Sequence, residues 1–227
     1  MKMKLGRIFL LVALILVSEI SYAQTILDRG ICGDNANWTL YDNGELVIAG
    51  TGEMTDFDFN AAPWLNKSVI RIIIEEGITR IGTYSFSQCK SIVSVTCPET
   101  LTSIGEGAFW MCDNLQNINI PDEVTTIEGS ALYHCTRLAK ITIPRKLRYI
   151  GEGAFCDCTN ITSLFIPKEC PLTSIGGFGG CTNLKNVTLS ETIKRIEEGA
   201  FNDCSSLANI IIPKGVVNIG GGAVRGT

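Results

Sequence analysis

The sequence contains little histidine and no excess of basic residues. Of its 227 residues only His134 is a histidine, while 19 are lysine or arginine and 23 are aspartate or glutamate. A zinc site built on several imidazoles is therefore excluded, and a Cys–His nucleophile pair would have to use this one side chain. His134 occupies a variable position before Cys135, which favours an ordinary surface role. The net charge of −4 gives no electrostatic basis for binding nucleic acid.

Long apolar runs are absent after the first part of the chain. Residues 8–17 form one such run, which is too short to span a membrane comfortably. It follows the basic residues Lys2, Lys4 and Arg7 and precedes Ser21 and Ala23, which are small residues at the positions that a signal peptidase reads. We expect export with cleavage near Ala23 and no transmembrane segment in the mature chain. An uncleaved anchor is the alternative.

Catalytic and cofactor motifs are also missing. The paired carboxylates at 75–76 and 197–198 fall in different turn regions, where a solvated charge is the ordinary state. The glycine-rich stretch at 176–180 lacks the spacing of a nucleotide-binding loop, and it falls where tight turns are needed. The sequence therefore predicts no catalytic residues, no metal site, no cofactor and no enzymatic activity.

Cysteine is abundant, and most of it is periodic. Six of the ten cysteines are each 23 residues apart, namely Cys89, Cys112, Cys135, Cys158, Cys181 and Cys204. A disulfide framework has no reason to keep a fixed period, whereas a stacked repeat has. Parallel side chains of equivalent residues do not point at each other as a disulfide requires, so we expect a column of buried free thiols. Disulfides or metal ligation are the alternatives.

The other four cysteines lie outside this column. Cys97 occupies a strand core position, where other rows carry Ile or Leu. Cys32 stands alone near the beginning of the chain and is expected to be buried. Cys156 and Cys170 belong to one row and are expected nearer the surface, where they either remain free or form a local disulfide.

The same apolar pattern recurs every 23 residues from residue 69 onward. In the row 104–126 it comprises Ile104, Ala108, Phe109, Cys112, Leu115, Ile118, Ile120, Pro121 and Val124. Alternation in L-x-x-I-x-I indicates a short strand with one buried face, which the following proline ends. A single row cannot bury its own apolar face. Stacked rows can, and their strands would form a parallel sheet along one side.

These rows, with L-x-x-I-x-I-P and I-G-x-x-A-F-x-x-C, resemble the BspA-like class of bacterial leucine-rich-repeat surface proteins. The stretch at 38–54 also resembles the segment that often precedes such arrays. The resemblance implies an α/β-type repeat solenoid of mostly short parallel strands with turns, coiled right-handedly and covered by an N-terminal β-hairpin cap. Strands at 38–41 and 45–48 would form this hairpin around Asp42-Asn43-Gly44.

The expected organisation is therefore a signal peptide at 1–23, a β-rich cap at 24–68 and about six and a half coils at 69–227. The rows depart from the pattern in a shortened fifth row, in Ser190 at a proline position and in Val224 at a phenylalanine position. The seventh row is incomplete in this sequence, which raises the possibility of end-to-end contact through the last coil.

The outward positions of the strands are the candidate binding face. Stacking aligns them into columns of mostly small, hydrogen-bonding side chains. The candidates are Thr96, Asn117, Asn119, Lys140, Thr142, Phe165, Asn186, Thr188 and Ile211. The alternative is that Thr and Asn serve only solubility and cross-strand pairing. The resemblance implies adhesion to, or recognition of, a host or neighbouring-cell protein or glycan. A rigid spacer within a larger surface complex is the other hypothesis.

Overall fold

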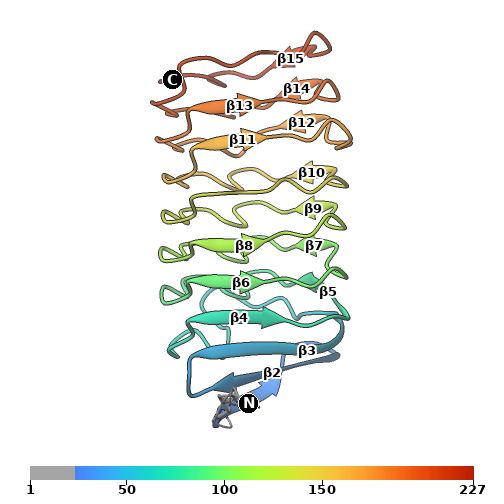
Figure 1. Cartoon of the computed structure of the whole chain (residues 1–227), viewed down its shortest axis with the longest axis vertical. Helices are drawn as coiled ribbons and strands as arrows, with labels where there is room; N and C mark the ends of the chain where they lie inside the picture. The colour runs from blue at the N-terminus through green and yellow to red at the C-terminus, as the bar shows by residue number, and fades with distance from the viewer. Residues whose placement is uncertain (1–23) are drawn as a thin grey trace, which may run out of the picture.

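A computed structural model describes residues 24–227, and the predicted signal peptide at 1–23 lies outside the described residues. The described chain is an elongated stack of coils with the β-rich cap at one end and the last coil at the other (Figure 1). The predicted repeat solenoid is confirmed. Residues 24–227 contain strands and turns but no helix, so none of them forms a helix that could cross a bilayer.

The cap contains the predicted hairpin and continues into the coils. β1 (Ile26–Ile31), β2 (Asn35–Tyr41) and β3 (Glu45–Glu53) are antiparallel neighbours, and Leu40 pairs with Leu46 across the turn. Gly44 has a φ of 77° in this turn, a conformation that glycine adopts without strain. β3 is longer than predicted because it also pairs in parallel with β4 (Arg71–Ile74) and β5 (Ile78–Ile81). It is therefore both the last strand of the cap and the first strand of the coils.

Each regular coil contributes a strand to each of two parallel ladders. We call the first ladder the strand face; it comprises β4, β6 (Ser94–Thr96), β8 (Asn117–Asn119), β11 (Ser163–Phe165) and β13 (Asn186–Thr188). We call the other the second face; it comprises β5, β7 (Ser103–Ile104), β9 (Thr126–Ile127), β10 (Tyr149–Ile150), β12 (Ser174–Ile175), β14 (Arg195–Ile196) and β15 (Asn218–Ile219). Figure 1 shows the two ladders running along the stack.

A third side, the turn side, lies between the second face and the strand face of each coil. Backbone N–H groups here donate to carbonyls of the following coil, as from Phe109 to Ala131 at 2.7 Å and from Leu132 to Ala154 at 2.8 Å. In the coils from 81–103 to 196–218, the Phe and Cys positions lie on this side and point inward, where they are buried. The turn side therefore joins consecutive coils independently of the two strand ladders.

Equivalent apolar residues stack through the core. The rings of Phe86 and Phe109 are parallel to within 18° at a centroid separation of 5.2 Å, and those of Phe155 and Phe178 to within 11° at 4.9 Å. Burying each such side chain contributes about 1.5–3 kcal/mol. Because these rings pack against rings of neighbouring coils, no coil completes its core alone.

The six periodic cysteines are buried and free in the structure. Five of them also bond to the preceding coil. The Sγ of Cys112 donates to the carbonyl of Phe86 at 3.0 Å, and Cys204 donates to Phe178 at 3.1 Å; Cys135, Cys158 and Cys181 make the corresponding bonds. Each acceptor carbonyl also receives a backbone N–H within its own coil, so the thiol uses its second lone pair.

The other cysteines are also unbonded to one another. Cys32 and Cys97 are buried as expected, and burial raises the pKa of their thiols to about 11 and about 12. The alternative of a Cys156–Cys170 disulfide is wrong for this structure, because both thiols are free. Cys170 is fully buried, contrary to expectation, and donates to the carbonyl of Leu147 at 3.3 Å. Cys156 is half-buried beside Gly179, on the turn side.

The thiols should be protected from alkylation in the folded protein. Burial raises the pKa of Cys89 and Cys158 to about 12, so the reactive thiolate is scarce at pH 8. We expect iodoacetamide to label at most Cys156 in the native state, and the other thiols at least about a hundredfold more slowly than in the unfolded chain. Mass spectrometry after labelling in urea without reductant should find all ten thiols alkylated. A smaller number would show that disulfides form.

Candidate ligand-binding face

The predicted binding column is exposed and in register. Thr96 pairs with Asn119 on the neighbouring strand, and Phe165 pairs with Thr188. These side chains point outward because the alternating residues Val95, Leu164 and Val187 point into the core. All nine candidate residues are solvent-exposed: Thr96, Asn117, Asn119, Lys140, Thr142, Phe165, Asn186, Thr188 and Ile211.

One candidate has a structural partner. The amide of Asn119 accepts from the backbone N–H of Cys97 at 2.8 Å and donates to the carbonyl of Cys97 at 3.0 Å. Both polar atoms of this side chain are thus used to join two coils. Asn119 supports the strand face rather than offering a free amide to a ligand.

The strand face is interrupted in its middle. β8 pairs with β6, and β11 pairs with β13, but the residues between them do not continue the ladder. In the described chain, no backbone hydrogen bond joins residues 139–143 to the strand on either side. Ile141 and Ile143 nevertheless remain buried, so the segment keeps its inward and outward alternation. Its N–H and C=O groups are therefore unpaired along both edges.

The ladder of the second face is also interrupted, at nearly the same height in the stack. β10 pairs with β9, whereas β12 pairs with β14, and no ladder joins β10 to β12 in residues 24–227. The row 150–174 is two residues longer than the regular row, with the additional residues after Cys158, and Pro171 within it has no N–H to donate. We call the boundary between coil 127–149 and coil 150–174 the seam.

The seam is held mainly on the turn side. His134 and Leu132 donate their N–H groups to the carbonyls of Cys156 and Ala154, both at 2.8 Å, and the thiol of Cys158 donates to Leu132. Beyond the turn side, Cys170 bridges the seam through its bond to Leu147. The two coils are thus joined along one side and separated along both strand ladders.

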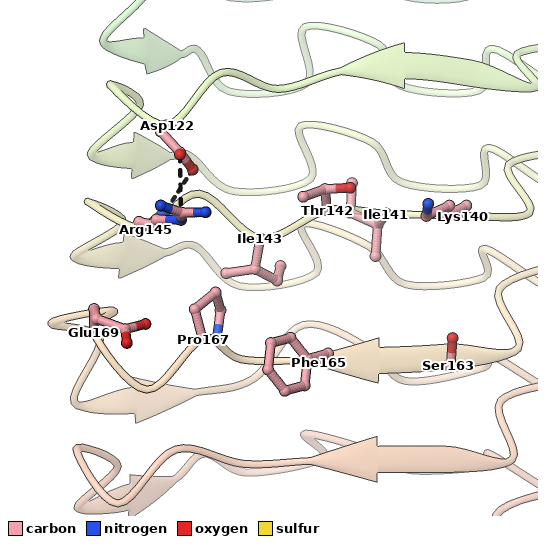
Figure 2. Close-up of a pocket in the computed structure, with 10 residues that line it drawn as sticks. All are labelled: Asp122, Lys140, Ile141, Thr142, Ile143, Arg145, Ser163, Phe165, Pro167 and Glu169. Carbon is pink, nitrogen blue, oxygen red and sulfur yellow. Dashed lines mark hydrogen bonds and ion pairs between the residues drawn. The ribbon is translucent and has the colours of Figure 1, made fainter.

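A hollow of about 660 Å³ lies on the strand face at the seam. Its lining comprises Asp122, Lys140, Ile141, Thr142, Ile143, Arg145, Ser163, Phe165, Pro167 and Glu169. Figure 2 shows the ring of Phe165 beside Pro167, with Lys140, Thr142 and Ser163 above and alongside. Three predicted residues, Lys140, Thr142 and Phe165, therefore come together in one place. The hollow itself could not be predicted, because the residues of both flanking strands follow the regular repeat.

The positive and negative charges of the residues that line the hollow cancel. Arg145 Nε lies 3.4 Å from Asp122 Oδ2, and the Arg145 backbone N–H donates to Asp122 Oδ1 at 3.0 Å. Lys140 and Glu169 are the other two charged residues of the lining. Two cations and two anions therefore surround an apolar floor, and the hollow carries no net charge at neutral pH.

Other titratable groups do not assemble into a site. His134 Nδ1 lies 4.0 Å from Asp157 Oδ2 at the edge of the turn side. Among residues 24–227 no three histidine, cysteine or acidic side chains are placed to hold a metal ion. The strand face itself offers hydrogen-bonding side chains together with the exposed apolar side chains of Phe165 and Ile211.

The parallel ladders, the stacked core and the 23-residue coil define a leucine-rich-repeat solenoid. The family described as "BspA type Leucine rich repeat region" matches residues 60–177 and 172–227 in six copies. The chain therefore belongs to the BspA-type leucine-rich-repeat family. No match was found among curated protein sequences.

Solved structures support the same assignment. A leucine-rich repeat protein of T. pallidum is 26% identical, covering 81% of this chain and 82% of that one, with a TM-score of 0.63. A leucine rich cell surface protein of Faecalibacterium prausnitzii is 27% identical with a TM-score of 0.64 and covers 89% of this chain. The match spans only 52% of that second protein.

Hydrogen exchange should detect the interruption of the strand face. The amides of Thr142 and Ile143 lack a backbone acceptor, whereas β6 pairs with β4 on one side and with β8 on the other. We expect the amides at 140–143 to exchange at least about tenfold faster than the equivalent amides at 94–97. Amide-resolved exchange measured by NMR would check this, with β4 as the internal control. Equal protection at both levels would show that the ladder is continuous in solution.

Proposed function

We propose that this protein is a non-enzymatic binding protein, exported from the cell, that recognises a macromolecule through its strand face. The observation that carries the proposal is the aligned column of exposed side chains, which includes Phe165 at 59% exposure and Ile211 at 84%. Large apolar side chains this exposed are suited to contact with a partner. Solenoids characteristically use such extended faces for binding.

The expected partner is a protein or glycan of a host or neighbouring cell. This rests on family membership, on the predicted signal peptide and on the similar F. prausnitzii protein, which is described as a cell surface protein. The net charge of −4 argues against a nucleic acid as the partner. Adhesion is the role that requires both a location on the cell surface and a binding face.

Two charges placed in the column should abolish ligand capture. We expect the double variant Phe165→Glu/Thr188→Glu to lower capture at least about tenfold, because charges would have to be desolvated at the contact. The melting temperature should change by no more than about 2 °C, since both side chains are exposed. Capture on arrays of extracellular-matrix proteins and glycans, together with thermal melting, measures both effects.

The control is Tyr149→Glu/Thr173→Glu, which places the same charges on an exposed aromatic residue and an exposed threonine near the second face. Capture should survive in this variant. An equal loss of capture in both variants would contradict the assignment to the strand face, and a large loss of stability in the first would assign packing roles to its residues.

Assembly into a larger surface complex is a second candidate function. The last described coil exposes Val217 at 82% and Ile219 at 55%, besides Ile211. Ile219 occupies the position at which Ile127 and Ile196 are buried, and Val217 adds an exposed apolar side chain beside it, so a second copy could contact both.

Association through this coil should depend on concentration. We expect sedimentation velocity of the chain to show a rising mean mass between about 1 and 100 μM, and Val217→Lys to weaken the association at least about tenfold. Ile31→Lys is the control, because Ile31 is 80% exposed but lies in the cap at the other end of the stack. A monomer at every concentration would contradict self-assembly.

A further inference from the structure

The hollow at the seam differs chemically from the paired part of the strand face. Between β4, β6 and β8 neighbouring strands satisfy each other's backbone groups, and the surface offers side chains alone. At the seam the hollow has unpaired backbone groups from residues 139–143 beside it, in addition to the side chains of its lining. Its volume of about 660 Å³ lies within the range of small-ligand pockets.

Phe165 supplies an aromatic surface within this hollow. Its ring is 59% exposed and is seen nearly face-on beside Pro167 in Figure 2. No other aromatic side chain lines the hollow, so the ring is not covered by a stacking partner there. A flat, exposed ring can pack against the aliphatic face of a ring-shaped ligand.

Polar groups that can donate or accept surround the ring. Lys140 can donate, Thr142 and Ser163 can donate and accept, and Glu169 can accept. Within the described chain, none of these four side chains has a hydrogen bond or ion pair to another residue. A ligand with many groups that both donate and accept would fit this set.

The balance of charge excludes a strongly charged ligand as the best fit. The two cations and two anions of the lining cancel, and one cation, Arg145, is already paired with Asp122. A polyanion would gain attraction from Lys140 but meet repulsion from Glu169 and Asp122. The lining therefore favours a neutral, polar ligand.

An extended peptide fits the unpaired backbone less well. A peptide that adds to a sheet requires a free edge alongside which a whole strand can lie, about 4.8 Å away. Here the free edge at 139–143 faces other strands of the same stack, and the turn side holds the neighbouring coils together. A strand could enter only if the coils separated further, whereas a hydroxyl group could reach in from outside.

We propose that the hollow at the seam binds a neutral carbohydrate. One pyranose ring packs on Phe165, and its hydroxyl groups bond to Lys140, Thr142, Ser163 and Glu169 and to the free backbone groups of residues 141–143. This inference deepens the proposed function, on which it rests, by naming the ligand class at one part of the strand face.

The test is titration of the chain from residue 24 onward with neutral oligosaccharides. Maltopentaose, chitopentaose and xylopentaose are the probes, and ligand-observed and protein-observed NMR are the readouts. At least one probe should bind with a Kd at or below about 1 mM and shift the signals of residues 140–143 and 163–169. Phe165→Ala should weaken this binding at least about tenfold, while Phe165→Trp should retain it.

Two controls make the result specific. Tyr149→Ala removes an exposed aromatic residue of the second face and should leave saccharide binding unchanged. Heparin tests a polyanionic glycan, and a proline-rich decapeptide tests an extended peptide. Preferential binding of either, or unchanged saccharide binding in Phe165→Ala, would overturn the proposal.

The experiment also separates this inference from the proposed function. If no neutral saccharide binds but the strand-face variant Phe165→Glu/Thr188→Glu still loses a captured protein, the carbohydrate proposal fails and the proposed function stands. If no probe binds and no macromolecule is captured, both fail. Saccharide binding that is lost in Phe165→Ala and kept in Tyr149→Ala supports both.

Discussion

The hydrogen bonds between equivalent backbone groups of successive coils are the constraint on which the rest of the structure depends. They require each coil to return to the same place after 23 residues, about one strand spacing further along the stack. Once that return is fixed, equivalent side chains must lie on one another. The phenylalanine stack and the cysteine column follow from it. Cysteine suits its corner because it fills an apolar position and still donates to a carbonyl of the preceding coil.

The same constraint explains how the stack can open locally and remain one body. Three sides join each pair of regular coils, so the loss of two ladders at the seam leaves the turn side intact. The additional residues in coil 150–174 lie away from the turn side, and the later shortening restores the cysteine period. Coil 175–195 consequently pairs again with its neighbours through β13 and β14. The chain thus contains a change in row length and a surface hollow while its core stays buried.

Periodicity was sufficient to predict the columns, the outward positions and the cap hairpin, because each depends on spacing alone. It was not sufficient at the seam, where Ile141 and Ile143 keep the regular pattern while their backbone loses its partners. The alternative of a Cys156–Cys170 disulfide rested on the two residues belonging to the same row. They occupy different columns, which place them on different sides of the coil. Residue 170 follows Leu101, Val124 and Leu147 at intervals of 23, and this spacing indicates a buried core position far from the turn side.

The balanced charge of the hollow has a consequence for how it can bind. A site without a strong field of one sign gains little from long-range attraction, so its affinity must come from contacts made after encounter. A single exposed ring and a few hydrogen bonds at the seam provide only modest affinity. Tight capture therefore requires a ligand that repeats along its length and engages several places on the face at once. Phe165 and Ile211, two coils apart in one exposed column, are the two places where such a ligand would find apolar contact.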